Sequence, residues 1–178
     1  YKLNELSRLD VNYLILAYRG FSGNKGSPSE KGLYIDSIAA KNWLNNIGVE
    51  DESIILYGES LGTAVAVNLA SENEFAGIIL ESPFTSMVKL AKKYYPYLPV
   101  KILLKDKYES EKKLRGINTP ILVMHGEQDT IVPFEMGKRI YEISLQPKYK
   151  YFNEIDDHMM DYNSQLIQSI NRFIKSLN

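Results

Sequence analysis

Short apolar runs alternate along this chain with longer segments whose apolar residues recur at helical spacing. The apolar runs occupy Val11–Ala17, Ser53–Tyr57, Gly77–Leu80, Pro120–Met124 and Tyr149–Phe152. Runs of this kind are typical of strands that are buried on both faces of a parallel sheet. The helical pattern occupies Glu30–Ile47, Leu61–Ala70, Phe134–Leu145 and Tyr162–Leu177. Because strands that alternate with helices form βαβ units, we expect an α/β fold with a mostly parallel sheet and helices on both faces.

Two of the predicted helices carry an apolar stripe of the kind that usually faces a core. In the first helix the stripe is Ile35, Ile38, Ala39, Trp43 and Ile47, and in the last helix it is Leu166, Ile167, Ile170, Phe173, Ile174 and Leu177. Gly48 is the predicted stop of the first helix, because glycine is common just after a helix end. Residues 1–9 have leucines at helical spacing and are expected to form the end of a helix.

The alternation of strands and helices is interrupted only between residues 84 and 117. The chain has 178 residues, which lies within the size range of one domain, and neither a repeat nor a low-complexity linker divides it. We therefore expect a single domain over residues 1–178, with a small cap-like excursion at about 84–117.

Composition and charge exclude several classes of function. The formal net charge is −1, whereas a nucleic-acid-binding domain is usually strongly basic. The absence of cysteine excludes a disulfide framework, a thiolate nucleophile and a cysteine-based zinc site. No apolar run approaches the roughly 20 residues that a membrane span needs, and residues 1–6 do not resemble a signal peptide. We expect a cytoplasmic location, unless a segment upstream of Tyr1 directs the protein elsewhere. The sequence predicts no oligomeric state.

The segment Gly58-Glu59-Ser60-Leu61-Gly62 fits the pattern G-x-S-x-G. It lies between a predicted strand and a predicted helix, which is the setting that a nucleophile elbow requires. The turn would hold Ser60 in a strained conformation at the carboxyl edge of the sheet, and Gly58 and Gly62 would let strand and helix approach closely. The backbone amide of Leu61, at the helix start, would then face a developing oxyanion. The alternative is a plain glycine-rich turn in which Ser60 caps the helix.

Serine is a weak nucleophile at neutral pH and needs an adjacent base, which is usually an oriented histidine. Ser60, Asp129 and His158 follow the order Ser, Asp, His that is found in hydrolases with this elbow, and each lies just beyond a predicted strand. The chain has one other histidine, His125, which precedes the acid and is interpreted as a packed structural residue. Asp156 and Asp157 are expected to serve the loop or to face solvent. A metal site on His125, Asp129 and His158 is disfavoured, because the chain lacks the i, i+4 pair of ligands on one helix that marks such sites.

With these residues placed, the chain resembles the α/β-hydrolase superfamily, and within it the serine-aminopeptidase-like and lipid-thioester hydrolases that are built on one small domain. The similar stretches, in the order of the family, are Tyr18–Gly23, Gly58–Gly62, Glu81–Ser86, His125–Asp129 and Ile131–Pro133. The resemblance implies a small-molecule carboxylic ester or thioester as substrate, no cofactor, and an acyl-enzyme on Ser60. Alternatives are a peptidase or acyltransferase with the same triad, or a non-catalytic module of the same fold.

The resemblance also shows a departure from the family pattern, because the first three strands and the loop after the third are missing from this sequence. That loop normally supplies the second oxyanion donor. The third strand normally lies between the strands predicted at 11–17 and 53–57, so the sheet closes up, a partner chain fills the slot, or the chain is a fragment of a longer protein. We favour a fragment. Loss of one oxyanion donor costs roughly 10²–10³ in kcat, so we expect weak activity or none.

An aromatic and apolar patch, Tyr94–Leu104, lies within the predicted cap. Lys92, Lys93, Lys105 and Lys107 flank it. The patch is either a short cap helix packed on the domain, an acyl-chain lid, or a surface that rests on an anionic membrane.

Overall fold

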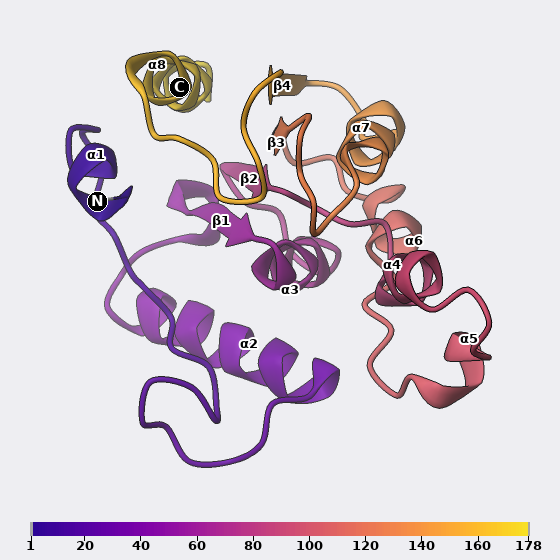
Figure 1. Cartoon of the computed structure of the whole chain (residues 1–178). Coiled ribbons are helices and arrows are strands. Elements are labelled where there is room, and N and C mark those ends of the chain that lie inside the picture. Colours follow the sequence, from indigo (N-terminus) through magenta and orange to yellow (C-terminus); the bar gives the residue numbers. More distant parts are fainter. Residues whose placement is uncertain (1, 178) are drawn as a thin grey trace.

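The computed structural model describes residues 2–177 and contains a parallel sheet covered by helices (Figure 1). The strands are β1 (Ile55–Glu59), β2 (Gly77–Glu81), β3 (Ile121–Gly126) and β4 (Lys148–Asn153). They pair in the order β1-β2-β3-β4, and each pair is parallel. The predicted α/β class and parallel sheet are therefore confirmed. Tyr1 and Asn178, the ends of the predicted domain, lie outside the described residues.

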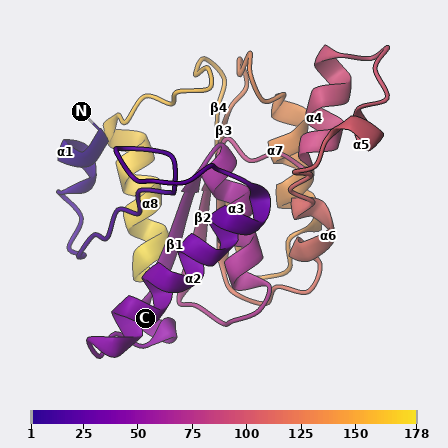
Figure 2. The ribbon, with the colours of Figure 1, turned by 90° about the horizontal axis from the view of Figure 1, so that it is seen from below.

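Helices lie on both faces of the sheet, as Figures 1 and 2 show. They are α1 (Lys2–Leu6), α2 (Glu30–Asn46), α3 (Leu61–Ala70), α4 (Met87–Tyr94), α5 (Val100–Leu103), α6 (Ser110–Leu114), α7 (Phe134–Ile143) and α8 (Ser164–Lys175), with a 3₁₀ turn at Asp51–Ser53. One core cluster joins the sheet to α3, α6 and α7, and a second joins it to α1 and α8. The stripe predicted for the last helix packs into this second cluster.

Burial of the two central strands on both faces explains why their sequences contain unbroken apolar runs. Every residue of β2 and β3 is buried. Ile78 and Leu80 belong to the cluster beneath α3, whereas Ile79 belongs to the cluster beneath α8. Successive side chains of a strand point to opposite faces, so a strand with two covered faces is apolar along most of its length. Buried polar side chains occur only at the carboxyl ends of these two strands, at Glu81 and His125.

The prediction of a strand at Val11–Ala17 is wrong. Residues 12–18 form no strand, and Ile15 is 66% exposed. β1 pairs with β2 on one side, and no other strand of residues 2–177 pairs with its opposite edge. Leu16 and Ala17 instead line a hollow with Ala39 and Ala40 of α2. The backbone of this run has no neighbouring strand to pair with, so the sheet does not close up.

The predicted stripe of the first helix is also wrong in most of its members. Ile35, Ala39, Trp43 and Ile47 are exposed, and only Ile38 packs against a core cluster. The buried face of α2 is instead offset from the stripe, and Leu33 is fully buried on it. Helix α2 packs on α3, so the face of α2 that meets α3 is the one that is covered. The predicted end of the helix is confirmed, since α2 stops at Asn46 and Gly48 has a φ of 88°.

The predicted excursion at 84–117 contains α4, α5 and α6. Leu114 at the end of α6 belongs to the core, so the later part of the excursion packs on the body of the molecule. The α4–α5 segment projects outward, at the right of Figure 1. Within residues 2–177, none of the helices has the length and apolar character needed to cross a membrane. The cytoplasmic location stays a prediction.

Candidate active site

Ser60 occupies the turn between β1 and α3. Its φ is 49° and its ψ is −114°, a conformation that costs free energy for a residue with a side chain. Two backbone hydrogen bonds hold it there. The Ser60 amide donates to the Glu81 carbonyl over 2.9 Å, and the Ser60 carbonyl accepts from the Thr63 amide over 3.0 Å. Ser60 therefore lies at the carboxyl edge of the sheet with the strained backbone that the sequence predicts.

Gly58 allows α3 to pack tightly against β1. A Cβ atom on Gly58 would lie 2.5 Å from the Gly62 carbonyl oxygen and 2.7 Å from the Thr63 Cα atom. The predicted role of Gly58 is thus confirmed. The same prediction for Gly62 is wrong, because a Cβ atom there would meet nothing within 4 Å. Gly62 takes part in the close approach through its carbonyl group and not through its lack of a side chain.

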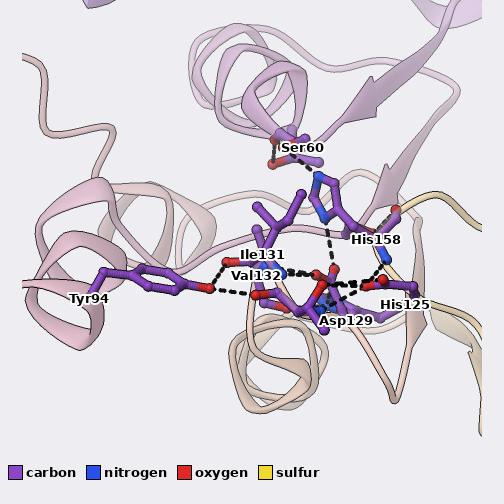
Figure 3. Close-up of polar contacts among 11 residues, drawn as sticks. Ser60, Tyr94, His125, Asp129, Ile131, Val132 and His158 are labelled. Atoms are coloured by element: carbon purple, nitrogen blue, oxygen red, sulfur yellow. Dashed lines mark hydrogen bonds and ion pairs between the residues drawn. The ribbon is translucent and has the colours of Figure 1, made fainter.

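His158 connects Ser60 to Asp129, although the three residues lie far apart in sequence (Figure 3). The His158 Nε2 atom is 3.1 Å from Ser60 Oγ, and the Nδ1 atom is 2.8 Å from Asp129 Oδ2. An ionised carboxylate only accepts hydrogen bonds, so Nδ1 carries the proton. The lone pair of Nε2 then faces the Ser60 hydroxyl, which is the arrangement of a base beside its nucleophile.

Hydrogen-bond donors hold both oxygens of the Asp129 carboxylate. Oδ1 accepts from the amides of Ile131 and Val132, over 2.8 and 2.7 Å, and Oδ2 faces both histidines. Burial raises the pKa of this carboxyl, but hydrogen bonds from His125, His158 and the two amides outweigh burial and hold the pKa well below its usual range. Asp129 is therefore a fixed negative charge beside His158.

His125 is buried, with 0% of its surface exposed, as its interpretation as a packed residue predicts. Its Nε2 atom lies 3.0 Å from the Val132 carbonyl oxygen and 3.1 Å from Asp129 Oδ2. Both neighbours are acceptors, so Nε2 carries the proton. The Nδ1 side faces Gly137 of α7, where a Cβ atom would come within 2.1 Å of the ring. The contact with Asp129 was not predicted, and the i, i+4 spacing of His125 and Asp129 was the available signal.

Asp157 joins the loop that carries His158 to the loop that carries Asp129. Its Oδ1 atom accepts from the Thr130 amide over 2.8 Å, from the Thr130 hydroxyl over 2.9 Å, and from the His158 amide over 2.7 Å. The carbonyl of buried Asp156 accepts from the Gln128 amide over 3.0 Å. Both aspartates thus serve the loops, and their contacts fix the distance between Asp129 and His158.

Leu61 is the first residue of α3 and directly follows Ser60. The first amides of a helix have no acceptor within the helix, and the helix dipole makes this end attractive to negative charge. The Leu61 amide lies at this end of α3. Within residues 2–177, no three His, Cys, Asp or Glu side chains gather in a group that could hold a metal ion.

The sequence is similar to proteins of known family. The model of the phospholipase/carboxylesterase family matches residues 36–178. The Mycobacterium tuberculosis protein Rv2307c is 42% identical over 144 residues, which are 80% of this chain and 51% of that protein. Lysophosphatidylserine lipase ABHD12 of Danio rerio is 34% identical over 161 residues, which are 80% of this chain and 42% of that protein. The chain spans about half the length of these curated relatives.

The fold is similar to that of solved esterases. The crystal structure of the esterase RhEst1 from Rhodococcus sp. ECU1013 matches 98% of this chain and 85% of its own chain, with a TM-score of 0.72 and 19% identity. Identity this low shows a shared fold alone. The family match covers most of the chain and includes all four strands, Ser60, Asp129 and His158. The chain therefore belongs to the phospholipase/carboxylesterase family of the α/β-hydrolase superfamily.

Proposed function

We propose that this chain is the catalytic part of a serine hydrolase, with Ser60 as the nucleophile, His158 as the general base and Asp129 as the acid that orients the imidazole. The observation that carries the proposal is the continuous path of hydrogen bonds from Ser60 Oγ to His158 Nε2, and from Nδ1 to Asp129 Oδ2. The positive φ of Ser60 supports it, because strained serines of this kind expose their hydroxyl at a sheet edge.

In the proposed reaction the Ser60 oxygen attacks the acyl carbon of the substrate while His158 takes the hydroxyl proton. The negative charge that develops on the acyl oxygen is stabilised by the Leu61 amide at the start of α3. His158 then gives the proton to the leaving alcohol or thiol, and the acyl group stays on Ser60. A water that His158 deprotonates hydrolyses this acyl-enzyme and restores the free serine.

We propose a carboxylic ester or thioester as the substrate. The description of the family as phospholipase/carboxylesterase supports an ester, and so does the name of the relative ABHD12, which is a lipase. The Leu61 amide is the one oxyanion donor that we assign within residues 2–177, so turnover by this chain is expected to be roughly 10²–10³ below that of a site with two donors.

The test is labelling with a fluorophosphonate probe, which reacts with an activated serine. We expect one modified residue, Ser60, located by peptide mass spectrometry, and no labelling of a Ser60→Ala variant. Ser71→Ala is the matched control, because Ser71 is exposed and lies just after α3. An unlabelled wild-type chain would contradict the proposal and favour a non-catalytic module. Slow hydrolysis of p-nitrophenyl acetate and of a short S-acyl thioester, compared with a peptide amide, then separates ester from peptidase chemistry.

A further inference from the structure

The segment from Tyr94 to Lys105, which we call the cap tip, is the most exposed apolar part of the molecule outside the proposed site. It consists of the end of α4, α5 and the turn between them, and it projects from the body in both views (Figures 1 and 2). Tyr97 is 98% exposed and Ile102 is 84% exposed. The other exposed apolar residues of the cap tip are Tyr94, Tyr95, Leu98 and Leu103. Exposed apolar side chains that gather on one short segment are typical of an interaction site.

Positive charge surrounds these apolar residues. Lys92, Lys93, Lys101 and Lys105 are exposed, and residues 92–105 contain no aspartate or glutamate. The chain as a whole has a net charge of −1, so the four lysines form a local excess and do not reflect a basic protein. The partner that this combination fits has an apolar interior and a negatively charged surface.

The cap tip is attached to the proposed active site through Tyr94. The Tyr94 hydroxyl is shared between the carbonyl oxygens of Thr130 and Ile131, each 2.7 Å away (Figure 3). The amide of Ile131 in turn donates to Asp129. Hydrogen bonds therefore connect the start of the cap tip to the loop that holds the acid.

The loops that carry Asp129 and His158 lie at the same end of the molecule as the cap tip, at the top of Figure 2. Exposed apolar side chains also flank the two site residues. Ile131 lies on the first loop, and Ile155 and Met159 lie on the second. A surface that contacts the cap tip would therefore also lie near the loops that carry Asp129 and His158.

We propose that the cap tip docks this protein on an anionic phospholipid bilayer. The tyrosines lie at the level of the headgroups, where aromatic residues with a polar end are favoured. The leucine and isoleucine side chains enter the boundary with the acyl chains, and the lysines contact the anionic headgroups. A single acyl chain is a poorer occupant, because such a ligand needs a concave pocket and Tyr97 is almost fully exposed.

The test is co-sedimentation of the chain with vesicles of phosphatidylcholine, with and without phosphatidylglycerol. We expect binding to the anionic vesicles, little binding to the neutral ones, and weaker binding at high salt because salt screens exposed charges. A Ser60→Ala variant is expected to bind equally well, so the result does not depend on the proposed chemistry. A wild-type chain that ignores anionic vesicles would overturn the proposal.

Two pairs of variants identify the surface. Each lysine near an anionic surface is worth about fivefold in affinity, so Lys101→Glu/Lys105→Glu is expected to weaken binding at least about 25-fold. The matched control is Lys25→Glu/Lys175→Glu, which makes the same change of charge at exposed lysines elsewhere. Equal losses in both pairs would show that net charge alone matters and would contradict docking by the cap tip.

The apolar part of the surface has its own pair of variants. Tyr97→Ser/Ile102→Ser is expected to weaken binding, and Trp43→Ser/Ile47→Ser, on the exposed stripe of α2, is expected to leave it unchanged. Thermal unfolding checks that each variant remains folded. We expect all of them to fold, because the four replaced side chains are exposed. Unchanged binding of the Tyr97 and Ile102 variant would overturn the insertion of the cap tip into the bilayer.

Discussion

The Nε2 atom of His125 lies 3.1 Å from Oδ2 of Asp129, the oxygen that also faces His158 at 2.8 Å. Two backbone amides hold the other oxygen of the same carboxylate. The carboxylate thus has donors on four sides and cannot rotate without losing one of them. Because the orientation of His158 depends on Asp129, His125 acts on the proposed triad as a positioning residue, although it does not touch the reacting atoms.

Replacement of His125 tests this role. His125→Phe removes the donor, so Asp129 is freer to turn, and we expect kcat for an ester to fall on the order of 10- to 100-fold with KM nearly unchanged. His125→Gln keeps an N–H donor and is expected to recover part of the loss. The measurement is steady-state kinetics together with the rate of fluorophosphonate labelling at Ser60. Equal effects of Phe and Gln, in proportion to lost stability, would indicate a purely structural histidine.

The three residues of the proposed triad lie beyond the carboxyl ends of strands, and this placement was predictable from the sequence. Ser60 follows β1, Asp129 lies three residues beyond β3, and His158 lies five residues beyond β4. Parallel strands bring their carboxyl ends to one edge, so strand order and chain order were sufficient to bring these three together. The contact of His125 was not predictable in the same way, because it depends on how the ring packs against Gly137.

Two failed predictions of apolar burial concern segments that lie next to each other. Both the run at Val11–Ala17 and the stripe of α2 are apolar, and both are largely exposed. Apolar periodicity shows that a surface favours burial, but it does not show which element covers it. At the free edge of β1, residues 2–177 provide no strand to cover these surfaces. By contrast α3, which is buried over most of its length, begins and ends where the sequence predicts.

Asp129 should make stability depend on pH in the acid range. Its hydrogen bonds lower its pKa in the folded state, so ionised Asp129 stabilises the fold above its unfolded pKa of about 3.9. This contribution is lost as the pH falls from that value toward the folded pKa. Asp129→Asn is therefore expected to cost about 2 kcal/mol in the free energy of unfolding near neutral pH, and less below pH ~4.

Urea unfolding over the pH range checks this expectation. The matched control is Glu127→Gln, which removes an exposed carboxylate from the same loop and should change stability little. A difference between wild type and Asp129→Asn that persists undiminished at low pH would show that the ionised form of Asp129 is not the stabilising one.

The two glycines of the turn at Ser60 should respond in opposite ways to a methyl group. Gly58→Ala would place a Cβ atom 2.5 Å from the Gly62 carbonyl, and backbone atoms cannot move aside as a flexible side chain can. We expect a loss of roughly 1–3 kcal/mol or more in stability, together with slower labelling of Ser60 as α3 is displaced. Gly62→Ala meets open space in a helix, where alanine is favoured over glycine by about 1 kcal/mol. Urea unfolding of the two variants measures the difference, and equal destabilisation would contradict the close approach of β1 and α3 at Gly58.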